Sequence, residues 1–213
     1  STETPAAAVS TIQSWINAQF GSKETNACLV LNEVDASTWN SSSGSAYRAW
    51  LVNTMSALNT AGYKNIILYA ENSLATKSTA ITWQSIAQYA NIGDECYIDG
   101  PTAVAANFSV SKLQSVYQAS YDAWTNTSSG AGVPAAKVFL CEHVSVNQYA
   151  SSNYWGADGV SGTQWEQTIE ARDLAIHNIG FGGFIGYAWD KDAQATGNPT
   201  TDLANQIAYE KAY

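Results

Sequence analysis

The segment NIILYAEN, residues 65–72, is an apolar and aromatic run that ends in a carboxylate, and other segments of the chain share this pattern. They are CLVLNEVD (28–35), ECYIDG (95–100), KVFLCEHV (137–144) and GGFIGYAWD (182–190). Short apolar runs bounded by turn residues are typical of strands that are buried on both faces. These segments therefore predict strands that carry acids at or just past their ends, namely Glu33, Glu71, Asp99, Glu142 and Asp190.

Segments with helical periodicity alternate with these strands. Helices are expected over residues 5–20, 45–61, 78–90, 110–124, 163–178 and 201–213. Such alternation implies parallel strands joined by right-handed crossovers. The sequence thus predicts an α/β fold that forms one domain over residues 1–213. Long loops are expected after the strands, at residues 36–44, 100–109, 145–162 and 191–200, on the side where parallel α/β folds bind ligands.

The composition limits the classes of partner. The 213 residues include 18 acidic and 9 basic side chains, which gives a net charge of −9. This charge disfavours nucleic acid, whose binding depends on basic contacts to phosphate, and disfavours an anionic membrane surface. No apolar run approaches the roughly 20 residues of a membrane-spanning helix. Only 13% of the residues are charged and 12% are aromatic, a composition associated with secreted carbohydrate-active proteins.

Other motifs carry less information. No His, Cys and Asp cluster has the spacing of metal ligands, and no Gly-x-Gly-x-x-Gly follows a strand, so neither a metal nor a cofactor is expected. The chain has an odd number of cysteines, namely Cys28, Cys96 and Cys141. The first interpretation is that all are buried free thiols, and the alternative is one disulfide with one free thiol. Sequons at Asn40, Asn107 and Asn126 are consistent with a secreted protein.

An ordered set of residues connects three of the strand ends. Asn32-Glu33 closes the first visible strand, Glu142 lies at the end of the fourth, and Trp189 at the end of the fifth. This pattern resembles the clan of retaining glycoside hydrolases built on (β/α)8 barrels. In that clan an Asn-Glu pair closes strand four, a second Glu closes strand seven, and a Trp closes strand eight. The same intervals occur here, because Glu142 lies three strands after Glu33 and Trp189 lies four strands after it.

The resemblance implies a mechanism and a fold. Glu33 would be the general acid/base, Glu142 the nucleophile, Asn32 a substrate-binding neighbour and Trp189 a platform for a sugar ring. The first three strands of such a barrel have no counterpart in this chain. The expected fold is therefore a shortened or incomplete (β/α) TIM-like barrel, with about five parallel strands and about six helices. Replacing either Glu by Gln is expected to reduce turnover by orders of magnitude with little effect on folding.

Further side chains at the same strand ends and loops are expected to contact a carbohydrate substrate, because aromatic rings stack on pyranose rings and carboxylates accept hydrogen bonds from hydroxyls. They are Trp39, Glu71, Asp99, His143, Tyr154, Trp155 and Asp190. Asp35 has a competing interpretation as a turn residue. The five tryptophans in predicted helices, at 15, 50, 83, 124 and 165, are expected to pack in the core.

Alternatives to the two-glutamate mechanism stay open at this point. Glu142 could instead be the ion-pair partner of Arg48 or Arg172. Glu33 and Glu142 could act together only if the sheet curves, because neighbouring parallel strands are about 4.8 Å apart. In a flat sheet, Asp99 with Glu142 or Glu71 with Asp99 would be better pairs. The functional alternatives are a non-catalytic carbohydrate-binding protein derived from such a barrel, and an inverting hydrolase or lyase that uses another acid pair.

Overall fold

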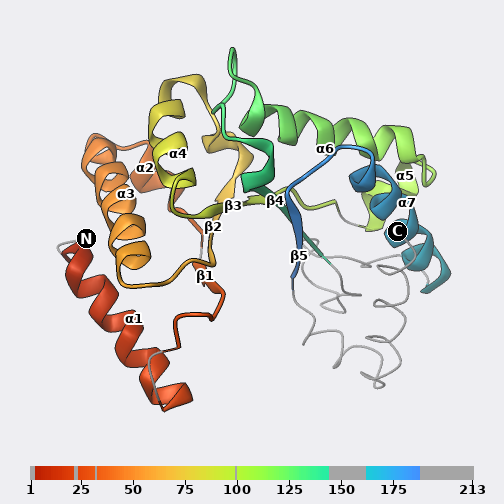
Figure 1. Cartoon of the computed structure of the whole chain (residues 1–213). Coiled ribbons are helices and arrows are strands. Elements are labelled where there is room, and N and C mark those ends of the chain that lie inside the picture. The colour runs from red at the N-terminus through yellow and green to blue at the C-terminus, as the bar shows by residue number, and fades with distance from the viewer. Residues whose placement is uncertain (1–2, 22–23, 32, 99, 144–161, 188–213) are drawn as a thin grey trace. The chain divides into compact units, whose positions relative to one another are not determined.

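The structure is a computed structural model that describes residues 3–21, 24–31, 33–98, 100–143 and 162–187 (Figure 1). Strands alternate with helices along these residues, which confirms the expected α/β class. The chain forms two compact units. One consists of Ser1–Asp94 and Ala123–Val138, and the other of Glu95–Asp122 and Phe139–Tyr213.

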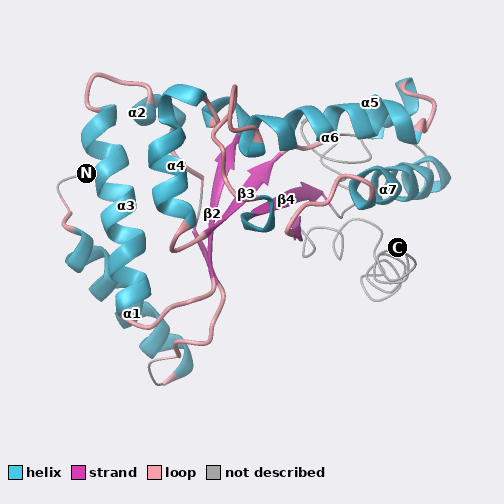
Figure 2. Cartoon of the chain, turned by 45° about the horizontal axis from the view of Figure 1, so that its top comes forward, coloured by secondary structure: helices cyan, strands magenta, loops and turns pink. Residues whose placement is uncertain are grey.

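The described residues of the first unit form three strands and four α-helices. In chain order they are α1 (Pro5–Phe20), β1 (Leu29–Leu31), α2 (Ala36–Trp39), α3 (Gly44–Thr60), β2 (Ile66–Glu71), α4 (Ala80–Ala87) and β3 (Asn91–Glu95), whose last residue falls in the second unit. Short 3-10 helices lie at Asn72–Leu74, Lys77–Thr79 and Ala135–Lys137. β1 pairs in parallel with β2, with Val30 opposite Ile67, and β3 is the next strand in the sheet. α3 packs beside both α1 and α4 (Figure 2).

Local sequence signals set the ends of α1. The Thr4 hydroxyl accepts a hydrogen bond from the Ala7 N–H at 3.2 Å, and Pro5 occupies the first turn, where a helix needs no N–H donor. Gly21 ends the helix with φ at 69° and donates its N–H to the Asn17 carbonyl at 2.8 Å. A residue with a side chain would be strained there. The predicted range 5–20 is confirmed.

Three tryptophans form the centre of the first unit. Trp39 stacks on Trp83 with ring centroids 4.5 Å apart, and Trp83 meets Trp124 edge-on at 4.9 Å. All three side chains are buried, and the Trp83 indole N–H donates to the Leu74 carbonyl at 2.9 Å. Core packing is therefore confirmed for Trp83 and Trp124. It is wrong for Trp15, which is 59% exposed on α1.

The described residues of the second unit form two parallel strands and three α-helices. They are α5 (Gly100–Ala105), α6 (Val110–Thr125), β4 (Val138–His143), α7 (Gly162–His177) and β5 (Gly183–Tyr187). The last three residues of α6 and the first residue of β4 fall in the first unit. β4 and β5 pair with Glu142 opposite Gly186. Residues from the β3–α5 connection and from these elements share one apolar core, made of Cys96, Ile98, Ala103, Leu113, Tyr117, Leu140, Ala171 and Ala175.

The third strand differs from its predicted position. It covers Asn91–Glu95, whereas the sequence pattern predicted 95–100. Gly and Asp are rare in strands, so the segment NIGDE carries little strand signal. The segment can nevertheless pair in the sheet, because Gly93 has no side chain and leaves room for the ring of Tyr69 on β2. A Cβ at position 93 would lie 2.8 Å from Cε1 of Tyr69. The apolar residues Cys96 and Ile98 are buried after the strand has ended.

Two predicted loops contain short helices. α2 lies within residues 36–44, and α5 within 100–109. Within the first predicted strand, 28–35, β1 covers Leu29–Leu31, and Val34 donates its N–H to the carbonyl of Tyr69 on β2 at 2.9 Å before Asp35 caps α2. The predicted loops at 145–162 and 191–200 fall almost wholly outside the described residues, and the predicted helix at 201–213 falls entirely outside them.

Candidate functional site

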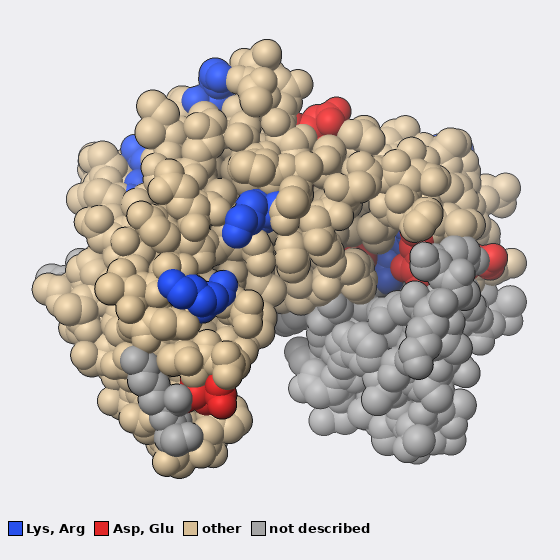
Figure 3. Space-filling model, viewed as in Figure 1, with Lys and Arg blue, Asp and Glu red and all other residues tan. Residues whose placement is uncertain are grey.

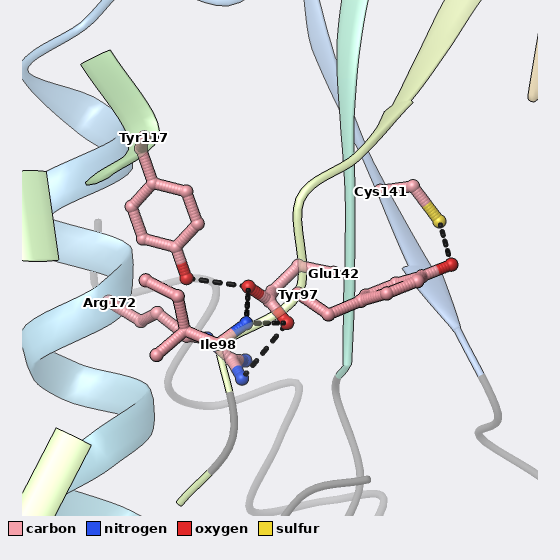
Figure 4. A network of polar contacts seen from close by, with 6 residues as sticks. All are labelled: Tyr97, Ile98, Tyr117, Cys141, Glu142 and Arg172. Atoms are coloured by element: carbon pink, nitrogen blue, oxygen red, sulfur yellow. Dashed lines mark hydrogen bonds and ion pairs between the residues drawn. The ribbon is translucent and has the colours of Figure 1, made fainter. Parts of the chain in front are cut away.

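Among the predicted site residues that the structure describes, Glu142 is the one whose carboxylate is held by a cation, a hydroxyl and a backbone N–H. It is the penultimate residue of β4, at the carboxyl end of the strand, and its side chain has no exposed surface. Its Oε2 accepts hydrogen bonds from the Tyr117 hydroxyl at 2.6 Å and from the Ile98 N–H at 3.0 Å (Figure 4). Its Oε1 lies 3.7 Å from Nη1 of Arg172, which is equally buried.

Helices bring the two side-chain partners to this carboxylate. Tyr117 comes from α6 and Arg172 from α7, and the Ile98 N–H comes from the connection between β3 and α5. Burial raises the pKa of Tyr117 well above its usual value of 10, and the nearby negative charge of Glu142 adds to the rise. Tyr117 is therefore a neutral hydroxyl donor at ordinary pH, not a phenolate.

This arrangement favours the ionised form of Glu142. A cation and two hydrogen-bond donors face its oxygens, and each interaction is stronger with a carboxylate than with a carboxylic acid. A glycosidase needs one carboxyl held protonated and one held ionised. The groups around Glu142 favour the second of these two states. The alternative interpretation as an ion-pair partner of Arg172 is confirmed as geometry; Arg48 instead donates to the Trp39 carbonyl at 2.6 Å.

The neighbouring residue Cys141 has a different environment. Its thiol lies 3.5 Å from the Tyr97 hydroxyl, which also donates to Glu95 at 3.3 Å. Successive residues of a strand point to opposite faces, so Cys141 does not share the surroundings of Glu142. No disulfide joins the three cysteines, all of which lie in described parts of the chain. Cys96 and Cys141 are buried as expected, whereas Cys28 is exposed, which corrects the prediction for that residue.

Glu33 and Glu71 both belong to the first unit and both are exposed. Glu71 is the last residue of β2 and accepts a hydrogen bond from the Ser73 hydroxyl at 3.1 Å. Glu33 lies two positions beyond the end of β1. Each carboxylate is thus at the carboxyl end of a strand and open to solvent, as a group that contacts a ligand requires.

Asp35 is a helix cap. Its carboxylate accepts hydrogen bonds from the Ser37 hydroxyl at 2.6 Å and from the Thr38 N–H at 3.0 Å, and it begins α2. The Ser37 hydrogen bond is the largest cause that lowers the pKa of Asp35 to about 2, and the bonds from Thr38 add to it. The turn interpretation of Asp35 is confirmed.

The prediction that the Trp39 ring stacks on a sugar is wrong. Its side chain is 1% exposed, lies against Trp83, and carries the Arg48 guanidinium 5.5 Å above its ring. The predicted loop is the helix α2, which directs the indole into the core. A sugar ring has no access to this indole.

The other predicted contact residues lie outside the described part of the chain. They are Asn32, Asp99, Tyr154, Trp155, Trp189 and Asp190. His143 is the last residue of β4, where it pairs with Tyr187 of β5, and its side chain is not among those described.

Two partners of Glu142 were not predicted to share its site. Neither the Tyr117 hydroxyl nor the Ile98 N–H is among the groups that the sequence pattern assigned to the site. A polar hydroxyl on an otherwise apolar helix face is the signal that could have indicated Tyr117, because a buried hydroxyl requires a hydrogen-bond partner. Among the described side chains, no group of three His, Cys, Asp or Glu residues could hold a metal ion.

Comparisons with known proteins give no relative. No protein-family model matches the chain, and neither the curated proteins nor the solved structures contain a match. Within the described residues, no helix has the length and apolar character needed to cross a bilayer. Charged side chains are sparse on the face drawn in Figure 3, in line with the low charged fraction of the sequence.

Proposed function

We propose that this protein is a secreted glycoside hydrolase that cleaves a polysaccharide or oligosaccharide by a retaining mechanism. Glu142 would attack the anomeric carbon, and Glu33 would protonate the leaving oxygen and then activate the water that releases the sugar. The finer fold assignment, a shortened (β/α) barrel, belongs to the same proposal. The carbohydrate substrate is consistent with the sparse charge and the negative net charge of the chain.

The observation that carries the proposal is the environment of Glu142. The carboxylate is held at the carboxyl end of a parallel strand by Tyr117, Arg172 and the Ile98 N–H. Such a group is fixed in position and stabilised as an anion, which are two of the properties required of a glycosidase nucleophile. A third property, access of the sugar to the carboxylate, is not provided by the fully buried side chain in this structure. Glu33 has the complementary property of solvent access, which a residue that exchanges protons with water requires.

The complete burial of Glu142 favours a second candidate, a non-catalytic carbohydrate-binding protein. In that case the Glu142–Arg172 pair is structural, and exposed groups such as Glu33 and Glu71 contact the glycan. A buried carboxylate held by Tyr117, Arg172 and the Ile98 N–H serves this structural role without further change. The two candidates differ in one measurable property, because only the hydrolase generates new reducing ends.

The test is a panel of neutral and cationic polysaccharides assayed for new reducing ends, beside a pull-down on the same panel. Glu33→Gln should reduce turnover by orders of magnitude, whereas Asp122→Asn, which changes an exposed acid on α6 outside the predicted site residues, should leave turnover unchanged. Glycan binding without product supports the second candidate. Full turnover in Glu33→Gln refutes the two-glutamate mechanism, and NMR of the first-formed anomer distinguishes retention from the inverting or lyase chemistry of another acid pair.

A further inference from the structure

One sequence motif has no role in the proposed catalysis: the sequon Asn126-Thr127-Ser128, which directly follows α6. The side chains of residues 126–129 are all exposed. A glycan is bulky and hydrophilic, so it is compatible with a folded protein only where the asparagine faces solvent. Asn126 meets this condition.

Hydrogen bonds of the turn fix the side-chain amide oxygen of Asn126 and leave its amide nitrogen available. Its Oδ1 accepts hydrogen bonds from the Ser128 N–H at 2.8 Å and the Ser129 N–H at 3.0 Å. Its Nδ2 donates no hydrogen bond to any described residue. The amide nitrogen is the atom that N-glycosylation modifies, so the existing hydrogen bonds of the turn can persist after modification.

The turn is anchored to the first unit on both sides of its exposed tip. The Ala131 N–H donates to the Ala123 carbonyl at 2.8 Å, and the Gln84 amide donates to the Ala131 carbonyl at 3.1 Å. Lys77 donates to the Thr127 carbonyl. A glycan on Asn126 would therefore project from a well-supported turn without displacing a core side chain.

We propose that Asn126 is an acceptor site for N-linked glycosylation. The donor is an oligosaccharide linked to a lipid pyrophosphate. A bond forms between Nδ2 and the anomeric carbon, the bond from that carbon to the pyrophosphate oxygen breaks, and the lipid pyrophosphate leaves with the electron pair. One amide proton passes to a base of the transferase, and no oxidant or reductant is needed. The proposal rests on the secreted location proposed above, and not on hydrolase activity.

The full chain is translated behind a supplied signal sequence in the presence of endoplasmic-reticulum microsomes. The translocated protein is then examined by peptide mapping with mass spectrometry. Treatment with peptide N-glycosidase should convert a modified Asn126 to Asp. Ser128→Ala removes the sequon hydroxyl while leaving the asparagine in place, and should abolish modification at this position. Ser129→Ala, an exposed serine outside the sequon, is the matched control and should leave the glycan present.

The outcomes separate this proposal from the proposed catalysis. An unmodified Asn126 in the translocated protein overturns the glycosylation site, and so does modification that persists in Ser128→Ala. The sequons at Asn40 and Asn107, whose side chains are also exposed, are mapped in the same experiment and do not affect the result for Asn126. Reducing-end assays on enzymatically deglycosylated protein test the hydrolase independently.

Discussion

Replacing Glu142 by Gln is expected to destabilise the second unit by about 3–5 kcal/mol, the usual cost of removing one partner from a buried ion pair. The substitution preserves side-chain volume but leaves Arg172 as a buried cation without its carboxylate. It also converts one oxygen to an amide, so that the donors from Tyr117 and Ile98 compete for a single neutral acceptor. A hydrogen bond to a charged group contributes about 1.5–3 kcal/mol. This expectation corrects the sequence-based view that the change would leave folding intact.

The assay is urea denaturation followed by far-ultraviolet circular dichroism, combined with hydrogen exchange of the β4 and α7 peptides. Glu71→Gln, at an exposed strand end, is the control and should change the free energy of unfolding by less than about 0.5 kcal/mol. The double variant Glu142→Gln with Arg172→Met should recover part of the loss, because it also removes the buried cation that has lost the Glu142 carboxylate.

A loss below about 1 kcal/mol in Glu142→Gln, with additive effects in the double variant, would refute the reasoning about this ion pair. The measurement also affects the enzymatic test. Turnover of the Glu142→Gln variant must be expressed per folded molecule, since unfolding alone would otherwise imitate the loss of a nucleophile.

Three further predictions concern other described residues. Because burial raises the pKa of Tyr117 above 10, its contribution to stability is present below pH 10 and is lost as the pH rises through the folded-state pKa. Urea denaturation across this pH range should show a steeper decline of the unfolding free energy for the wild type than for Tyr117→Phe. Equal slopes would contradict a raised pKa for Tyr117. The pKa of Asp35, lowered from 3.8 to about 2, gives stability that is present above pH 3.8 and is lost as the pH falls towards 2. Carboxyl NMR titration should show that Ser37→Ala raises this pKa, and an unchanged value would remove Ser37 as its main cause. Trp39→Ala should cost about 3–5 kcal/mol of unfolding free energy, as expected for a buried aromatic side chain, whereas Trp15→Ala at an exposed position should cost far less; similar losses in both variants would argue against the Trp39–Trp83 core.

The sequence alone determined the features that depend on local and periodic signals. The α/β class followed from the alternation of apolar runs with helical patterns, and the bounds of α1 followed from Pro5 and Gly21, whose backbone preferences act within one turn. The cap formed by Asp35 was predictable for the same reason. The proposed acid pair remains a prediction from the order of residues along the chain.

Only the tertiary structure decided which side chains are buried and what they contact. Trp39 lies in a segment of turn-like composition, yet it packs on Trp83, which is distant in sequence. The third strand is set by pairing beside Tyr69 and not by its own propensity, because Gly93 supplies space where a side chain would clash. Glu142 is surrounded by groups from α6, from α7 and from the β3–α5 connection, and no local pattern encodes such a meeting. The burial of a side chain and the partners that it contacts depend on segments that are distant in sequence. Both are therefore decided only when those segments pack together.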